Sequence, residues 1–475
     1  MNFNLNKKNG TKVTIIFENK KYDNNLLNYV QQKELFTGKF NEVYANLPFN
    51  AEKEILLGLG KEEDLTVDKV RQVFFTLAKK LLSTKELEVF IELPEKLNFS
   101  QEEFVKALVE GAQNATYKFD KYKSDRKQLP ELTINILANN KEDLKESLEE
   151  ATATMSSVFF ARDLVNERSE YLYPETLANI VLEKLSPLGV DVEVYDEKQC
   201  EEMGLKGLLA VGRASDKKPR FIVMKYMNDA DSDEVTGFVG KGVTYDTGGL
   251  SLKQTAGSMD IMFCDMGGAG SVIGAMHLIA QRKVKANVVA VVAACENSVS
   301  GSSYKPGDII STLSGKTIEV LNTDAEGRIT LADAMFYATD KLKVTRVVDL
   351  ATLTGACLVA LGEFYTGALT NNEVFYNQLN EAAKEAGERV WLLPADDSFR
   401  NLNKSTVADV KNVGGKLGGT ITAGLFIENF VANNTPWIHL DIAGTAYLSK
   451  AEKYLPKGAT GIHVKTLYNL VNKGK

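Results

Sequence analysis

The most restrictive feature of this 475-residue chain is a series of apolar segments in its second part, several of them apolar on both sides. A strand without a polar face has to be covered on both faces, as in sheets flanked by helices. The segments read "VDVEVYD", "RFIVMKYM", "EVTGFVGKG", "NVVAVVAACEN", "TIEVLNT", "TRVVDLAT" and "WIHLDIAG", and they alternate with helix-like stretches. We therefore expect an α/β fold with a mixed or mainly parallel central sheet in an α/β/α layering.

The glycine distribution divides the chain into two parts. Only five of the 36 glycines fall within residues 1–150. Strand-like stretches such as "KVTIIF" and "ELTINILA" alternate there with amphipathic ones such as "EDLTVDKVRQVFFTLAKKLL", which predicts a small α/β domain. The charged stretch "NNKEDLKESLEEATATMSSVFFARDLVN" predicts one long helix that leads into the second part. We expect an N-terminal domain at residues 1–150 and a larger domain at residues 151–475.

Composition argues against several classes of partner. A net charge of −7 gives no general attraction to phosphate backbones, so nucleic acid is a poor partner. The longest apolar run, "ANVVAVVAAC", is about half a membrane span, which predicts a cytoplasmic protein without a membrane partner. Four widely spaced cysteines indicate buried thiols rather than a disulfide framework or a thiolate zinc site.

The stretch "VLNTDAEGR", residues 320–328, follows one of the predicted strands, where active groups collect in sheets of this kind. In an extended segment Asp324, Glu326 and Arg328 would share one side. Thr323 and Glu326 also have the spacing of a capping box ahead of the helix-like "ITLADAMFYATDKL". Taken alone, the stretch leaves a helix cap and a ligand site both open.

Two further glycine-rich stretches carry charged residues. Residues 237–253, "GFVGKGVTYDTGGLSLK", contain Lys241, Asp246 and Lys253 but match neither the P-loop nor the dinucleotide-binding motif. The stretch "SMDIMFCDMGGAG" contains Asp260 and Asp265, and the latter is also a candidate N-cap.

Four of these acidic side chains would need cations if they converged. Carboxylates about 4 Å apart repel by roughly 4 kcal/mol per pair at an effective dielectric constant of 20. Two divalent cations would balance Asp246, Asp265, Asp324 and Glu326. The three histidines lack metal-ligand spacing, so oxygen atoms would supply most of the ligands.

Several motifs, in order along the chain, resemble those of one enzyme family. "VGKGVTYDTGGLSLK", "MFCDMGGAG", "NTDAEGR", "DLATLTGA" and "HLDIAGTA" together resemble the leucyl aminopeptidases, also called cytosol aminopeptidases, which are two-metal exopeptidases. The resemblance covers about residues 160–475. The first 150 residues carry no motif that we recognise, and the family's first domain is variable.

The resemblance implies a metal-dependent aminopeptidase with two divalent ions per subunit, Mn²⁺ or Zn²⁺. Asp246 and Glu326 would bridge both ions, Asp324 would bind one ion, and Lys241 and Asp265 would bind the other. Two catalytic residues are also implied. Lys253 would bind the substrate carbonyl and the developing oxyanion, and Arg328 would hold a bicarbonate ion that acts as general base.

The resemblance further implies a pocket for the first side chain of a peptide, with a preference for Leu and Met. The implied pocket residues are Met262, Thr352, Gly355, Ala443 and Ala446. It also implies a homohexamer to which the N-terminal domain could add contacts. The alternative function is that of a DNA-binding accessory protein, a second role of some relatives, although the net charge and the lack of a basic run in residues 1–150 argue against it.

Two departures from the family pattern affect the third motif. Phe263 stands where the family usually has a basic residue, and the stretch from Lys253 to Asp265 is one residue longer than usual. The extra residue is most easily absorbed in the polar "QTAGS" loop. We therefore expect Asp265, rather than Asp260, to be the metal ligand.

Overall fold

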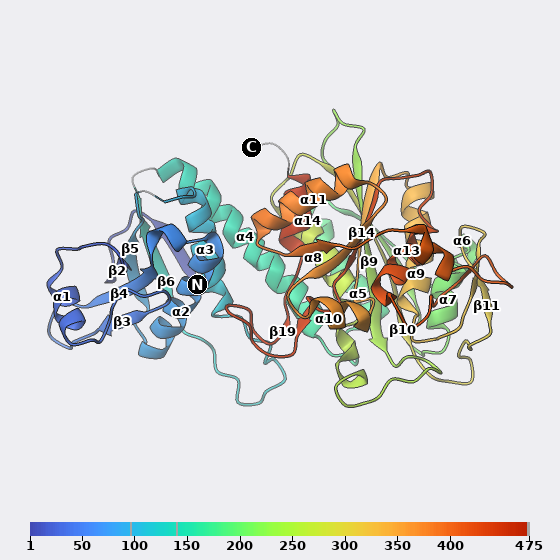
Figure 1. Ribbon diagram of the computed structural model, residues 1–475, viewed down its shortest axis with the longest axis horizontal. Coiled ribbons are helices and arrows are strands. Elements are labelled where there is room, and N and C mark those ends of the chain that lie inside the picture. The colour runs from blue at the N-terminus through green and yellow to red at the C-terminus, as the bar shows by residue number, and fades with distance from the viewer. Residues whose placement is uncertain (96, 139–140, 473–475) are drawn as a thin grey trace. The chain divides into compact units, whose positions relative to one another are not determined.

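The computed structural model describes residues 1–95, 97–138 and 141–472, which form two compact units (Figure 1). The first unit comprises Met1–Ser156 and Lys450–Pro456, and the second comprises Ser157–Ser449 and Lys457–Lys475. Helix α4, Lys141–Asn166, is the long helix that the sequence predicted, and the expected boundary at residue 150 lies within it. The start of the quoted stretch, residues 139–140, lies outside the described residues.

The first unit is a small α/β domain, as the sequence predicted. Its six-stranded sheet has the order β1-β6-β5-β2-β4-β3, and only the β3–β4 pair is antiparallel. Helices α2 and α3 pack against each other, and the rings of Phe74 and Phe104 meet edge to face. The elements are β1 (Asn2–Leu5), β2 (Thr11–Phe17), α1 (Asn25–Gln32), β3 (Val43–Asn46), β4 (Glu54–Gly60), α2 (Val67–Thr84), β5 (Glu88–Glu92), α3 (Gln101–Asn114) and β6 (Thr133–Leu137).

The second unit contains a mixed eight-stranded sheet in the order β15-β14-β17-β13-β9-β10-β8-β7. Strands β17, β13, β9 and β10 form its parallel centre, and antiparallel pairs flank them. This confirms the predicted mixed sheet. The strands are β7 (Asp191–Tyr195), β8 (Arg220–Met227), β9 (Val235–Asp246), β10 (Asn287–Asn297), β13 (Arg346–Ala351), β14 (Thr366–Thr370), β15 (Val390–Leu392) and β17 (Trp437–Asp441).

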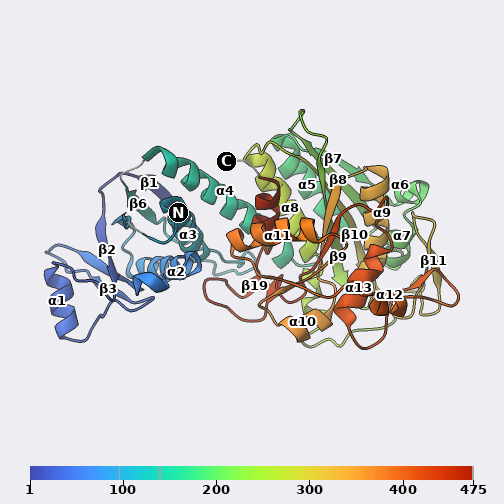
Figure 2. The same ribbon diagram turned by 45° about the horizontal axis from the view of Figure 1, so that its top comes forward.

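Helices cover both faces of this sheet, which confirms the α/β/α layering. Figures 1 and 2 show α8, α11 and α14 on one face and α7, α9 and α13 on the other. The helices are α5 (Pro174–Leu185), α6 (Glu197–Met203), α7 (Lys206–Gly212), α8 (Gly267–Gln281), α9 (Gly327–Phe336), α10 (Gly355–Leu361), α11 (Glu373–Ala386), α12 (Asp397–Leu402), α13 (Gly419–Glu428) and α14 (Val464–Val471). Two small sheets, β11 (Ile309–Ser311) with β12 (Thr317–Glu319) and β16 (Val410–Lys411), and β18 (Tyr447–Leu448) with β19 (Gly458–Ala459), complete the unit.

Helix α8 lies at the centre of this unit and packs on β9 and β13. Its glycines allow this approach, because a Cβ atom at Gly268 would lie 2.0 Å from the carbonyl oxygen of Leu350. The segment Met259–Gln281 is long and apolar enough to cross a membrane, yet 83% of its most apolar window is buried inside the protein. A helix enclosed in a core has the same composition, and α8 is enclosed in this way.

Candidate metal centre

The carboxyl ends of four parallel strands meet at one edge of the second unit's sheet. Strand β9 ends at Asp246, β10 at Asn297 and β17 at Asp441, while Thr352 follows β13 directly. Polar groups therefore gather where open α/β sheets bind their ligands.

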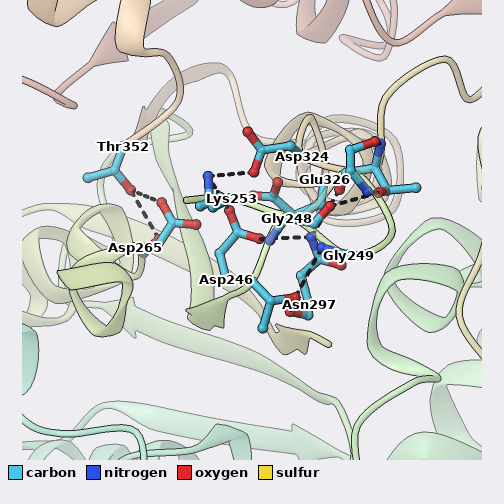
Figure 3. A network of polar contacts seen from close by, with 12 residues as sticks. Asp246, Gly248, Gly249, Lys253, Asp265, Asn297, Asp324, Glu326 and Thr352 are labelled. Carbon is cyan, nitrogen blue, oxygen red and sulfur yellow. Dashed lines mark hydrogen bonds and ion pairs between the residues drawn. The ribbon is translucent and has the colours of Figure 1, made fainter. Parts of the chain in front are cut away.

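Three carboxyl groups converge at this edge from separate segments. Asp246, Asp265 and Glu326 each contribute one oxygen atom to a group in which all oxygens lie within 4.8 Å of one another. All three side chains are buried. Asp324 joins them through Lys253 (Figure 3). We call these four acidic residues the carboxylate cluster.

Two lysines lie between the members of the carboxylate cluster. The Nζ atom of Lys241 is 2.8 Å from Asp265 Oδ2 and 2.9 Å from Glu326 Oε1. The Nζ atom of Lys253 is 2.9 Å from Asp246 Oδ2 and 2.5 Å from Asp324 Oδ1. Two ammonium groups thus offset only part of the negative charge of four carboxylates.

Burial makes this charge costly, and the pKa values of the cluster diverge accordingly. Burial raises the pKa of Asp265 to about 7 although Lys241 opposes the shift. Burial, Glu326 and Asp265 raise the pKa of Asp246. Burial also acts to raise the pKa of Glu326, but Lys241 and Lys253 outweigh it and the pKa falls. Buried, interacting carboxyl groups with shifted pKa values are typical of functional sites.

The residues fit a divalent metal. Glu326 Oε2 is buried and has neither a hydrogen bond nor an ion pair among the described residues. A buried carboxylate oxygen without a partner is costly unless a cation completes its environment. Carboxylate oxygens are ligands of Mn²⁺, and Zn²⁺ also accepts them.

Arg328 lies beside the cluster without pairing to it. Its Nη1 atom donates to the carbonyl oxygen of Asn412 at 2.7 Å, whereas its buried Nε atom has no partner in the described part of the chain. Burial lowers the pKa of Arg328 to about 10, while Glu326 and Asp441 oppose that shift. An unused guanidinium donor in a buried position suits a small anion.

Hydrogen bonds from two residues that the sequence analysis did not single out hold the side chain of Asp246 and the backbone beside Asp324. Asn297 Nδ2 donates to Asp246 Oδ1 at 2.8 Å and to the carbonyl oxygen of Thr323 at 2.9 Å. The hydroxyl group of Tyr304 donates to the same carbonyl oxygen. The sequence signals for Asn297 were its position at the carboxyl end of the predicted strand "NVVAVVAACEN" and the resemblance of "ENSVSGSSYKPGDI" to a stretch of the same family.

Two consecutive glycines make the turn after β9. Gly248 and Gly249 have φ values of +85° and +62°, in the left-handed region that favours glycine. A Cβ atom at Gly248 would lie 2.8 Å from Asp324 Oδ1, and one at Gly249 would lie 2.9 Å from Thr323 Oγ1. The turn thus lets the backbone approach Thr323 and Asp324 closely.

The segment 320–328 is neither extended nor capped as its spacing suggested. Glu326 is the N-cap residue of α9 with a helical backbone and no side-chain cap, and Arg328 lies within the helix. Thr323 Oγ1 instead donates to the carbonyl oxygen of Gly248 and accepts from the amide of Ser251. The capping-box reading is therefore wrong, because Thr323 joins two loops rather than capping its own helix.

Of the five implied pocket residues, Met262, Thr352 and Ala446 lie at the turn that precedes α8. Thr352 Oγ1 donates to Asp265 Oδ1 at 2.8 Å. A Cβ atom at Gly267 would lie 3.0 Å from the methyl group of Thr352 and 3.1 Å from the Cβ of Ala446. Met262 and Ala443 are partly exposed, and Gly355 is exposed at the start of α10.

The third motif separates its two aspartates. Asp260 is exposed in the short 3₁₀ turn Met259–Cys264, whereas Asp265 is buried against Lys241. Phe263 is buried as well. Its ring meets the ring of Tyr447 edge to face, and the guanidinium group of Arg168 lies 3.9 Å above it.

Comparison with known proteins gives consistent matches. The model of the cytosol aminopeptidase family's catalytic domain matches residues 159–468, and the model of its N-terminal domain matches residues 7–126. A probable cytosol aminopeptidase of Treponema denticola is 49% identical over 476 residues, with 100% of both chains covered. One from Clostridium tetani is 45% identical over 476 residues, with 99% of this chain and 98% of the relative covered.

Solved structures show the same likeness. A tomato leucine aminopeptidase mutant superimposes with a TM-score of 0.89 and 30% identity, covering 100% of this chain and 97% of the other. The bottromycin maturation enzyme in complex with Mn gives a TM-score of 0.88 and 30% identity, covering 98% and 99%.

Proposed function

This chain belongs to the cytosol aminopeptidase family and is a metal-dependent aminopeptidase that acts on peptides, and we propose that the carboxylate cluster is its active site. One observation carries the proposal. Three buried carboxylates from separate segments converge within 4.8 Å, and an oxygen of Glu326 has no partner among the described residues.

Two divalent cations, Mn²⁺ or Zn²⁺, are the proposed occupants. Asp246 and Glu326 would bridge them, Asp324 would complete one site, and Lys241 and Asp265 would complete the other. The Mn in the bottromycin maturation enzyme supports this choice. When bound, such cations make water a nucleophile near neutral pH and anchor the free amine of a substrate.

Lys253 and Arg328 are the proposed catalytic residues. Lys253 contacts both Asp246 and Asp324, so its ammonium group is a donor at the edge of the cluster for a substrate carbonyl oxygen. A fixed positive charge there stabilises the negative charge that develops on this oxygen. The unpartnered Nε atom of Arg328 would hold bicarbonate, the proposed general base.

The first side chain of the substrate would enter the pocket formed by Met262, Thr352, Gly355, Ala443 and Ala446. These residues are small or apolar, which favours Leu and Met over charged side chains. We further propose that the protein is cytoplasmic and assembles as a homohexamer. No comparison supports the alternative of a DNA-binding accessory protein.

The test is an assay on chromogenic aminoacyl substrates before and after removal of metal by a chelator. We expect hydrolysis to cease after chelation and to return with Mn²⁺ or Zn²⁺, with the highest rates for leucyl and methionyl substrates. An N-acetylated leucyl substrate is the matched control, because it lacks the free amine and should not react. Hydrolysis that persists without metal would overturn the proposal.

A further inference from the structure

A buried chain of hydrogen bonds leads from the half-buried Glu388 to the turn after β17. Glu388 Oε2 accepts from Thr466 Oγ1 at 2.6 Å, and Thr466 Oγ1 lies 3.1 Å from His463 Nδ1. On the other side of the ring, His463 Nε2 lies 2.8 Å from Thr366 Oγ1, which lies 2.8 Å from Thr445 Oγ1. No side chain in the middle of this chain is exposed.

The carboxylate at one end fixes the direction in which each of these hydrogen bonds is donated. Glu388 can only accept, so the hydroxyl group of Thr466 donates to it and accepts from Nδ1–H of His463. Burial lowers the pKa of His463, which keeps the ring neutral and leaves Nε2 as an acceptor. Thr366 therefore donates to Nε2 and accepts from Thr445.

The backbone of His463 is held in an uncommon conformation. Its φ value is +63°, in the left-handed region that is unfavourable for a residue other than glycine. Hydrogen bonds at both ring nitrogens fix the side chain in this position. Such backbone strain persists only where the surroundings hold it.

The far end of the chain lies in the turn Ile442–Ala446. The amides of Thr445 and Ala446 donate to the carbonyl oxygen of Ile442, and Thr460 Oγ1 donates to the carbonyl oxygen of Thr445. Ala446 contacts the start of α8, two residues beyond Asp265. Ile442 and Thr460 thus hold the backbone of Thr445, and its hydroxyl group contacts Thr366, while Ala443 and Ala446 of the same turn belong to the proposed pocket.

We propose that Thr366 and His463 are positioning residues for the turn Ile442–Ala446, which contributes Ala443 and Ala446 to the substrate pocket. They would thereby set the selectivity for the first side chain of the peptide. The inference rests on the proposed function, because it assigns Ala443 and Ala446 to that pocket. Neither Thr366 nor His463 needs to touch the substrate.

The direction of donation along this series of hydrogen bonds can be tested without an activity assay. The protein has only three histidines, so ¹⁵N-histidine NMR spectra can be assigned with single substitutions. We expect His463 to carry its proton on Nδ1, and Thr366→Val to shift its Nε2 resonance. A proton on Nε2 would contradict the proposed direction.

The positioning role is tested by Thr366→Val, with Thr370→Val as the matched control. Both threonines are buried on β14, but Thr370 donates to the carbonyl oxygen of Trp437 toward the opposite edge of the sheet. Thr366→Val should raise KM for a leucyl substrate and lower the leucyl-to-alanyl ratio of kcat/KM roughly fivefold, about 1 kcal/mol. Thr366→Ser should restore the ratio, and Thr370→Val should leave it unchanged.

The outcomes separate the inference from the proposed function. Equal ratios for Thr366→Val and Thr370→Val in an active enzyme would overturn the positioning role. A wild-type protein that cleaves no aminoacyl substrate would overturn the proposed function instead. If Thr366→Val does not fold, Glu388→Gln at the half-buried end should lower the same ratio to a smaller extent, and an unchanged ratio would count against the inference.

Discussion

At the scale of single residues, the site is an excess of buried negative charge that two lysines only partly offset. Lys241 and Lys253 each contact two members of the carboxylate cluster. Carboxylates about 4 Å apart repel by roughly 4 kcal/mol per pair at an effective dielectric constant of 20. Added cations would therefore stabilise the folded site as well as serve the reaction.

Asp265 and Asp260 provide a matched pair of substitutions. Asp265→Asn removes a buried carboxylate that contacts Lys241, so we expect this variant to lose one metal and nearly all activity. Asp260→Asn changes an exposed side chain five residues earlier and should keep the metal content and the activity of the wild type. Metal analysis and a leucyl assay on the two variants check this. The reverse result would make Asp260 the metal ligand. The extra residue between Lys253 and Asp265 would then not lie in the "QTAGS" loop.

Lys253 separates chemistry from metal binding. Because its charge would stabilise the oxyanion, we expect Lys253→Ala to lower kcat about 10²- to 10³-fold. The bound metal should remain, since the four carboxylates are intact. Metal analysis together with steady-state kinetics measures both quantities. Loss of metal in this variant would make Lys253 a structural residue.

The acidic residues were predictable from the sequence, but their supports were not. The resemblance of several motifs to one enzyme family pointed to Asp246 and Glu326, although Glu326 follows β12 of a small sheet and not a strand of the central sheet. Asn297 and Thr323 act through bonds between loops that are 26 to 75 residues apart, and no local pattern records such contacts. The same bonds explain why Thr323 does not cap α9.

At the scale of secondary-structure elements, the long apolar strands of the central sheet were predictable, whereas β14 and β15 were not. β9, β10 and β13 are long or wholly buried, so their sequences leave little choice. β14 reads "TGALT" and β15 has three residues, and both acquire strand structure from pairing in the sheet. Tertiary context decides such segments.

The contact between α8 and β13 gives a prediction on stability. Gly268→Ala would place a Cβ atom 2.0 Å from the carbonyl oxygen of Leu350, so we expect a loss of about 3 kcal/mol. Gly301→Ala is the control, because nothing lies within 4 Å of its Cβ position. Urea unfolding of both variants provides the measurement. Equal stabilities would show that α8 can move away from the sheet at little cost.

A buried pair between β17 and β13 gives a prediction on pH. His439 Nδ1 lies 2.6 Å from Asp349 Oδ1, and Trp437 Nε1 donates to Oδ2 of the same carboxylate. Burial acts to lower the pKa of His439, but Asp349 outweighs it and the pKa rises above 6.5, with Asp441 adding to and Arg328 opposing the rise.

Because the folded pKa of His439 is raised, its stabilising contribution is complete below pH 6.5 and is lost as the pH rises through the folded value. The melting temperature of the wild type should therefore fall over this range, and His439→Gln should flatten the fall. His277→Gln is the control, because burial lowers the pKa of His277 and its contribution changes below pH 6.5 instead. Identical profiles for the wild type and His439→Gln would contradict this account.

At the scale of the whole molecule, the proposed active site lies within one of the two units. Every described residue of the carboxylate cluster belongs to the second unit. The first unit has its own core around Phe74 and Phe104, and the family models match the two parts separately. The sequence distinguished these parts by glycine content, because the loops that surround the site need tight turns and close backbone approaches.

The most direct test of the central claim is the metal content per chain measured together with the rate of leucyl-substrate hydrolysis, in the wild type and in Glu326→Gln. We predict about two metals and full activity in the wild type, and loss of metal and activity with an intact fold in Glu326→Gln. Glu319→Gln is the control. Glu319 lies earlier in the same segment and accepts a hydrogen bond from Ser405, so this variant should behave as the wild type. Wild-type metal content and rate in Glu326→Gln would contradict the claim that the carboxylate cluster is the active site.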